Sequence, residues 1–227
     1  MLRFYLPILL IASSSFLTAQ DALVRGTVNV IHHTASASAN SDVIVWLTPT
    51  RSSGPVAPGP VVRLVQKNKR FIPHVIAVTA GTQIEFPNQD PFFHDVFSIY
   101  HGKPFDLGLY ESGSARKIKF SQPGVSYIFC SIHPQMNAAV VVLRTPFFAV
   151  TGSDGAFRIG HLPPGKYKLE VWYEFASESE LAALSRDVEI AAGEGAISTI
   201  TLHSSDASKE HLNKYGETYS PSQTDKY

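Results

Sequence analysis

The sequence predicts an all-β protein, and three observations lead to this class. The chain of 227 residues is 44% hydrophobic and 17% charged, which is the composition of a globular protein. It contains 15 Gly and 15 Pro among many Val and Thr residues, a mixture that favours short strands joined by turns. Most apolar segments alternate with polar positions, and only residues 177–185 have the pattern of a helical turn.

The first 19 residues have the features of a secretory signal peptide. A positive start at Arg3 precedes the apolar run FYLPILLIA, and cleavage is expected near Ala19. The run is far shorter than the ~20 residues of a membrane span, and no other segment is apolar enough for one. We therefore expect a periplasmic or secreted protein without a membrane span; the alternative is a buried N-terminal strand or helix. The net charge of zero argues against binding to nucleic acid.

Strands are expected throughout the first half of the chain. They lie at 22–30, at 42–50, within 61–90, where Pro73 and Gly81 separate three short strands, and at 91–100. The segment 51–60 contains three Pro and two Gly, which indicates a linker or a long loop. Residues 101–113 read as a long irregular connection.

The second half continues the alternating pattern up to a polar tail. Strands are expected at 114–120, 125–130 and 137–144, then on either side of the turns Asp154-Gly155 and Pro163-Pro164-Gly165, and twice within 186–202 around 193–195. The last residues, 204–227, are polar and show no periodicity. They are expected to be a disordered tail.

One short motif, FCSIHPQM at 129–136, carries unusual chemistry. It contains the only cysteine of the chain, Cys130, and the only methionine besides Met1, Met136, with His133 midway between them. A lone cysteine in an exported protein cannot form an internal disulfide. Thiolate, imidazole and thioether together are a soft donor set that selects copper and makes zinc a poor fit. The alternative is a buried cysteine with ordinary loop packing around it.

A fourth ligand has to come from elsewhere in the chain, and His94 is the best candidate. Its strand, 91–100, follows a turn and is expected to run beside the strand that ends at Cys130. Two nitrogens and a thiolate with a weak axial Met are the ligands of a blue-copper site. His74 and His101 are the alternatives to His94. The other histidines are expected to be exposed and without a role: His32, His33, His161, His203 and His211.

Residues 60–144 resemble the cupredoxins, small blue-copper proteins with a Greek-key β-sandwich fold. The likeness rests on AVTAGTQIEFPNQD, on FFHDV and on YIFCSIHPQM, whose short ligand loop resembles that of amicyanin more than that of plastocyanin. It implies one type 1 copper bound by His94, Cys130, His133 and Met136. Amicyanin and plastocyanin have Asn after the first histidine, where this chain has Asp95. The backbone N–H at that position is still expected to donate to the thiolate.

The resemblance implies a protein that carries single electrons between redox partners and is not an enzyme. Four protein ligands leave no open position for a substrate, and no second histidine cluster stands out. A redox partner is expected to dock near His133, with the ring edge of His133 at the surface and Pro134, Pro91 and Phe92 around it. Apolar neighbours are expected to exclude water: Phe92, Phe93, Phe97, Phe129 and Ile132. The alternatives are a periplasmic copper-binding or delivery protein, and an adhesion or glycan-binding module with structural copper.

The remaining strands resemble a second, smaller β-sandwich, the carboxypeptidase regulatory-like (transthyretin-like) domain. The resemblance rests on TGSDGAFRIGHLPPGKYKLEVWYE and the following VEIAAGEG. Strands similar to those that open this family, VRGTV and VIVWLTPT, precede the copper segment. We therefore expect a discontinuous domain of 22–58 and 145–203 into which the cupredoxin domain is inserted. The alternative is a linear order in which 22–60 adds strands to the cupredoxin domain.

Overall fold

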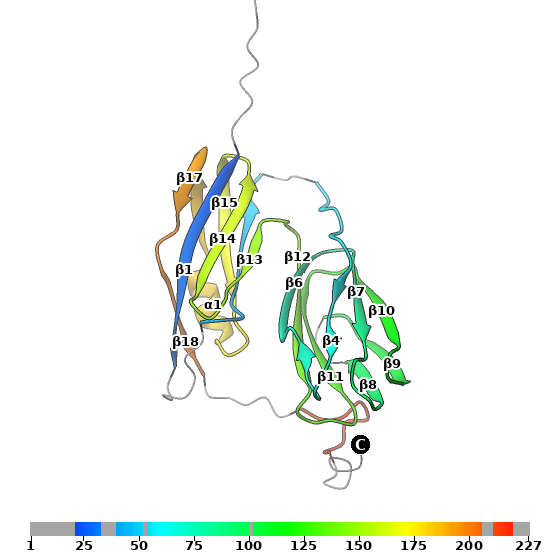
Figure 1. The fold of residues 1–227 in the computed structure, drawn as a ribbon. Helices are drawn as coiled ribbons and strands as arrows, with labels where there is room; N and C mark the ends of the chain where they lie inside the picture. Colours follow the sequence, from blue (N-terminus) through cyan, green and yellow to red (C-terminus); the bar gives the residue numbers. More distant parts are fainter. Residues whose placement is uncertain (1–20, 33–39, 52–53, 100–101, 206–210, 220–227) are drawn as a thin grey trace, which may run out of the picture.

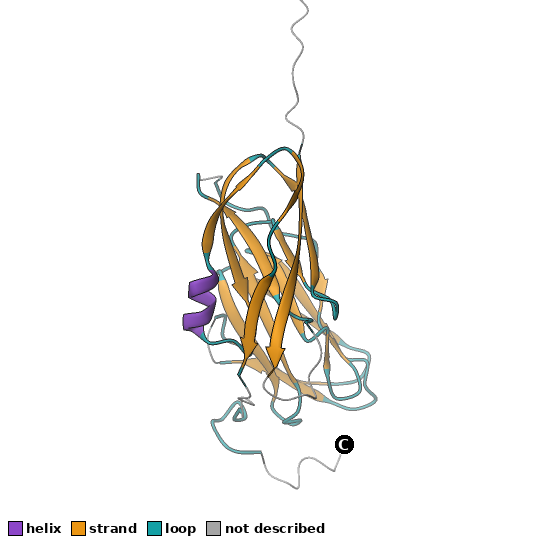
Figure 2. Cartoon of the chain, turned by 90° about the vertical axis from the view of Figure 1, so that its left-hand side faces the viewer, coloured by secondary structure: helices purple, strands orange, loops and turns teal. Residues whose placement is uncertain are grey.

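The computed structural model describes residues 21–32, 40–51, 54–99, 102–205 and 211–219. These residues form two β-sandwiches that lie side by side (Figure 1). Strands make up most of the described chain, and one short helix, α1 (Glu178–Leu184), lies at the edge of the first sandwich (Figure 2). The all-β class is confirmed. The signal expected over 1–19, His33 and His101 lie outside the described residues.

The first sandwich combines strands from both ends of the chain. One sheet contains β14 (Ala156–Leu162), β1 (Ala22–His32) and β17 (Gly193–Ala196), with β18 (Ile200–Ser204) also paired to β1. The other sheet has the order β13 (Phe148–Val150), β2 (Ile44–Pro49), β15 (Gly165–Trp172) and β16 (Arg186–Ile190). Alternate residues of β1 and β14 point into a core shared with β2 and β15, as a strand period of two requires.

The second sandwich contains only strands from the middle of the chain. Its larger sheet has the order β6 (Val75–Thr79), β12 (Asn137–Leu143), β11 (Gly124–Cys130), β8 (His94–Ser98) and β9 (Phe105–Tyr110). The smaller sheet has the order β10 (Ala115–Phe120), β7 (Thr82–Pro87) and β3 (Val62–Arg63). A short hairpin of β4 (Val65–Gln66) and β5 (Phe71–Ile72) completes it. Phe86, Phe120 and Ile128 are fully buried in the core between these sheets.

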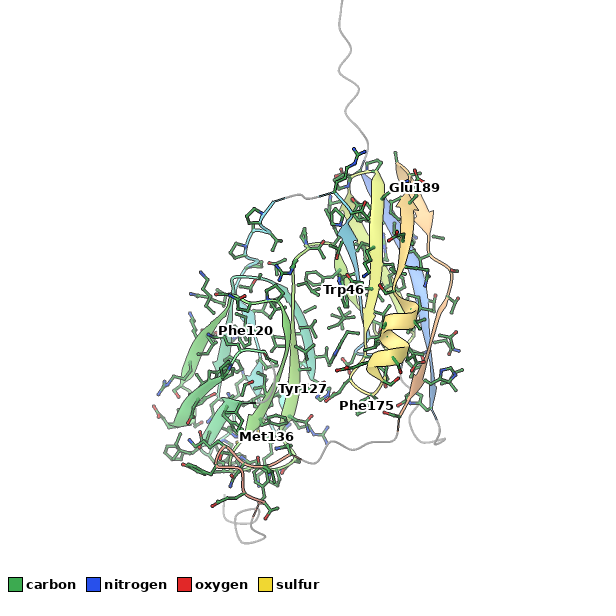
Figure 3. All side chains as sticks on the ribbon, turned by 180° about the vertical axis from the view of Figure 1, so that it is seen from behind. Trp46, Phe120, Tyr127, Met136, Phe175 and Glu189 are labelled. Atoms are coloured by element: carbon green, nitrogen blue, oxygen red, sulfur yellow. The ribbon has the colours of Figure 1, made fainter. Side chains whose placement is uncertain are left out.

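A third apolar cluster joins the two sandwiches. Ile44 and Trp172, from the first sandwich, pack with residues of β6 and β12 on the outer face of the second: Val75, Ala139, Val141 and Leu143. Trp46 lies on the side of the first sandwich that faces the second (Figure 3). The second sandwich is therefore not independent of the first, because part of its outer face is buried against it.

The structure differs from the sequence prediction in four segments. Residues 101–113 contain strand β9 (Phe105–Tyr110). The sequence pattern does not indicate this strand, because Gly108, at φ 66°, and a register shift opposite Asp95 interrupt the alternation of apolar and polar residues. The segments 61–90 and 186–202 contain more short strands than expected, with Gly193–Ala196 forming β17. Ser204 ends β18, and residues 211–219 of the expected tail lie against the second sandwich. In the part of the chain that the structure describes, no helix has the length and apolarity needed to span a membrane.

Candidate metal centre

Two neighbouring strands bring the predicted site together at one end of the second sandwich. Strands β8 and β11 are antiparallel, with Phe129 opposite Phe97 and Cys130 opposite Val96. The first residue of β8, His94, therefore lies beside the last residue of β11, Cys130. This confirms the expected pairing of the two strands. The turn that follows β11 returns His133 toward the same point, at the end of the sandwich where Met136 lies (Figure 3).

Three donor atoms converge in the protein interior. The Sγ atom of Cys130 lies 3.7 Å from Nδ1 of His94 and 3.5 Å from Nδ1 of His133. The ligand atoms of the three residues all lie within 4.8 Å of one another. His94 and Cys130 are 0% exposed and His133 is 1% exposed. Among the described residues, this is the one group of at least three His, Cys, Asp or Glu side chains arranged to hold a metal ion.

The distances fit a first-row transition metal at the centre of the cluster. Metal bonds of about 2.3 Å to sulfur and about 2.0 Å to nitrogen are typical of tetrahedral sites. At bond angles of about 110–120°, those bonds place sulfur and nitrogen about 3.5–3.7 Å apart. Both observed separations lie in this range. The two sulfur–nitrogen separations therefore fit such an ion.

Met136 is buried next to this cluster and closes the ligand loop. It is 0% exposed and belongs to the same apolar core as Cys130. Its carbonyl accepts a hydrogen bond from the Cys130 N–H (3.2 Å), and its own N–H donates to the His133 carbonyl (3.0 Å). The loop from 130 to 136 is thereby held as a tight turn.

Asp90 orients the imidazole of His94, a role that the sequence did not reveal. Its Oδ2 atom accepts a hydrogen bond from Nε2 of His94 at 2.9 Å, and the carboxylate is 3% exposed. Because Nε2 carries the proton, the lone pair of Nδ1 points toward Cys130. A carboxylate behind a histidine is a common way to fix the tautomer of a metal ligand. The spacing of four residues between Asp90 and His94 is the only signal in the sequence.

Burial sets the protonation state of the three donors in the metal-free protein. Burial raises the pKa of the Cys130 thiol to about 11, although the backbone N–H groups of Asp95, Ile132 and His133 oppose this change. Burial lowers the pKa of His133 to about 4, assisted by the charges of His94 and Lys69. Burial also lowers the pKa of His94. Near pH 7 both imidazoles are therefore neutral and able to bind a metal, whereas the thiol has to lose a proton.

Asp95 takes part in the site through its backbone and has an ion pair on its side chain. The backbone N–H of Asp95 opposes the rise in the pKa of the Cys130 thiol. The carbonyl of Asp95 accepts from the N–H of Ser131 at 2.8 Å. The carboxylate lies 2.9 Å from Nζ of Lys214. The side chain of Asp95 is thus paired with the C-terminal segment.

The expectation that the ring edge of His133 lies at the surface is wrong. His133 is 1% exposed, and its Nε2 atom is buried without a hydrogen-bond partner. The ring of Phe92 lies 5.4 Å from the rings of both His133 and His94, measured between centroids. Phe92 therefore covers the two imidazoles. Phe97 and Phe129 are core residues, and Ile132 packs against the core that contains Cys130, whereas Phe93 is 44% exposed.

Among the described residues, the remaining histidines lie outside the cluster, and two of them, His32 and His211, are half-buried where exposure was expected. The alternative ligand His74 is engaged with Glu174 at 2.6 Å and with the carbonyl of Asn137 at 3.2 Å. His161 is exposed and His203 pairs with Glu180. His211, which was expected to be exposed and without a role, packs on the ring of Phe129 at a centroid distance of 4.1 Å.

We compared the chain with protein-family models and with curated proteins, and neither comparison gave a match. Among solved structures, a purple cupredoxin from Nitrosopumilus maritimus matches at 22% identity, over 36% of this chain and 99% of that chain, with a TM-score of 0.33. A Cu-containing nitrite reductase from Thermus scotoductus SA-01 matches at 24% identity, over 51% of this chain and 28% of that chain, with a TM-score of 0.36. An oxidised mutant of amicyanin matches at 19% identity, over 37% of this chain and 82% of that chain, with a TM-score of 0.34.

Proposed function

We propose that this protein is an exported copper protein that carries single electrons between redox partners. The observation that carries the proposal is the buried convergence of Nδ1 of His94, Sγ of Cys130 and Nδ1 of His133. These three residues would hold one copper ion, with Met136 as a weak fourth ligand. Copper bound in this way supplies a one-electron couple between its cuprous and cupric states.

The surroundings of the cluster suit electron transfer better than catalysis or metal delivery. Three buried ligands and a buried thioether leave no position for a substrate at the metal. Phe92 covers both imidazoles and keeps water away from them. A delivery protein has to release its metal quickly, whereas ligands that are at most 1% exposed favour retention. A redox partner docking near His133 would therefore meet Phe92 in place of the imidazole edge.

A visible absorption spectrum of the mature protein loaded with copper tests this function. We expect an intense thiolate-to-copper band that is reduced reversibly by ascorbate and absent from Cys130→Ala. His161→Ala is the matched control, because His161 is 96% exposed in its side chain and lies on β14 of the first sandwich. A copper-loaded protein that is colourless and redox-silent would contradict the proposal. Rapid loss of copper to a mild chelator would favour delivery instead.

We further propose that 60–144 is a domain inserted into a sandwich made of 22–58 and 145–203. The pairing of β2 with β13 and β15 supports this division, because it joins residues on both sides of the middle segment. Limited proteolysis tests it. A fragment close to 61–144 is expected to resist further digestion, and cleavage that destroys both sandwiches together would contradict the division.

A further inference from the structure

The C-terminal segment 211–219, which we call the clasp, lies across the end of the second sandwich that contains the metal cluster. Figure 1 shows it as the reddish segment beneath β8 and β11. It is more than 75 residues away in sequence from every residue of the cluster. Three of its side chains, His211, Lys214 and Tyr219, bind residues that are ligand residues or their immediate neighbours.

Two clasp residues bind the loop that carries Cys130 and His133. The hydroxyl of Tyr219 donates to the Cys130 carbonyl at 2.8 Å. Nε2 of His211 donates to the Pro134 carbonyl, also at 2.8 Å. The oxygen of Tyr219 lies 3.2 Å from Nδ1 of His211, so the two side chains support each other. The clasp thus holds one carbonyl at the start of the ligand loop and another in its middle.

The third clasp residue binds the segment that carries His94. Nζ of Lys214 lies 2.9 Å from Asp95 and 3.0 Å from Asp106. Asp95 is 7% exposed and follows His94 directly. A carboxylate with so little access to water requires a cation or donors beside it. Lys214 therefore attaches the clasp to the second ligand-bearing segment while it satisfies a buried charge.

The clasp has an internal turn that presents Lys214. Oδ1 of Asn213 accepts hydrogen bonds from the N–H groups of Tyr215 at 2.9 Å and Glu217 at 3.0 Å. The backbone closes the same turn, because Asn213 N–H donates to the Glu217 carbonyl at 2.9 Å. Asn213 is 6% exposed. These hydrogen bonds give the clasp a defined backbone conformation.

We propose that the clasp is a positioning element of the metal centre, which locks the His94 segment and the Cys130–Met136 loop in their metal-binding arrangement. Partners behind the ligands typically change metal affinity by about 10–100-fold when they are removed. The clasp supplies such partners to both ligand-bearing segments at once. The effect of the clasp on copper affinity rests on the function proposed above, whereas its effect on the conformation of the ligand loop applies to the metal-free protein as well.

The experiment uses the full chain with Tyr219→Phe, Lys214→Met and the matched control Thr218→Ala. Thr218 precedes Tyr219 in the clasp, and it is exposed. The first measurement is the rate at which iodoacetamide alkylates Cys130 in the metal-free protein. We expect Tyr219→Phe to raise this rate about fivefold, the factor that one hydrogen bond contributes to a local opening equilibrium. The second measurement is copper affinity by competition with a chelator, which we expect to fall at least about tenfold.

A rescue experiment separates positioning from general stability. Asp95→Asn removes the buried charge that Lys214 compensates, so Lys214→Met is expected to have a much smaller effect on both measurements in that background. If Tyr219→Phe and Lys214→Met behave like Thr218→Ala in alkylation, the clasp proposal is wrong. If the wild type binds no copper yet alkylation responds as expected, the clasp stands and the proposed function fails.

Discussion

Replacement of Asp90 tests how the imidazole of His94 is prepared for a metal. The Asp90 carboxylate accepts three hydrogen bonds, from the N–H groups of Asn68 at 2.6 Å and Lys69 at 3.0 Å and from Nε2 of His94 at 2.9 Å. Burial alone would raise the pKa of Asp90, but these donors outweigh burial and hold its pKa below the usual value. The carboxylate is therefore ionised near pH 7 and serves as an acceptor only.

The expected loss of stability follows from the three donors. In Asp90→Ala, His94, which is 0% exposed, keeps a buried N–H without a partner, which costs about 1–3 kcal/mol. The two turn N–H groups can reach water, so each adds about 0.5–1.5 kcal/mol. The total of about 2–6 kcal/mol corresponds to a fall in Tm of about 10 °C for a chain of this size.

Asp90→Asn separates stability from metal binding. In the amide orientation that keeps the hydrogen bond from Asn68, its NH₂ group takes the place of Oδ2, which accepts from both Lys69 and Nε2 of His94, and cannot accept a hydrogen bond from either. His94 is then expected to carry its proton on Nδ1, the atom 3.7 Å from the Cys130 sulfur. A metal would have to displace that proton, so copper affinity is expected to fall about 10–100-fold with only a small change in Tm.

Chelator competition, thermal unfolding and NMR of the histidine ring nitrogens provide the measurements. The control is Asp154→Asn, the same chemical change in an exposed turn of the first sandwich. If Asp90→Asn binds copper as tightly as this control and keeps the proton on Nε2, the assignment of Asp90 as the orienting group is refuted.

The remaining predictions concern the joint between the sandwiches, a tight turn and the proton balance of the site. The hydrogen bond from Glu174 raises the pKa of His74 above its ordinary value of 6.5. The contribution of this pair to the stability of the folded protein is fully present below pH 6.5 and is lost as the pH rises through the raised pKa of His74. The free energy of unfolding in urea should show this pH dependence, and Glu174→Gln should abolish it. Gly155→Ala is expected to cost about 2–5 kcal/mol, because φ is +72° and the new Cβ would collide with the carbonyl oxygen of Val28. Gly195→Ala, with open space around it, should unfold like the wild type in the same assay. Copper binding at pH 7 is expected to release about one proton, which comes from the Cys130 thiol. Calorimetry in two buffers with different heats of ionisation measures this number. If no proton is released, the thiol is not protonated in the metal-free protein and the reasoning is wrong.

The ligand loop could be predicted from the sequence because its chemistry is local. Cys130, His133 and Met136 lie within seven residues, so their spacing is visible without knowledge of the fold. His94 required one further step, the pairing of its strand with β11, which the alternation of 91–100 indicated. The strands on either side of the sheet were also visible, since their apolar residues have a period of two.

The partners of these ligands could not be predicted, because they depend on contacts between distant segments. Asp90 reaches His94 only after the turn at 88–92 has folded, with the Asn88 amide bound to the Phe92 carbonyl at 2.7 Å. The clasp is polar and aperiodic, and its contacts span 77 to 119 residues. Strand β9 was missed for a different reason, since a bulge at Gly108 breaks the pattern on which strand prediction depends.

The clasp is effective only because the rest of the chain holds it close. Its direct contacts, a few hydrogen bonds and two ion pairs of Lys214, would bind a free peptide weakly, since each contributes little net free energy in water. Strand β18 fixes the chain at Ser204 in the first sandwich, and the cluster around Trp172 fixes the second sandwich against the first. The clasp therefore closes as an intramolecular step at an effective concentration on the order of mM. It follows that the order of the Cys130–Met136 loop depends on the integrity of the first sandwich, although that sandwich contributes no residue to the metal cluster.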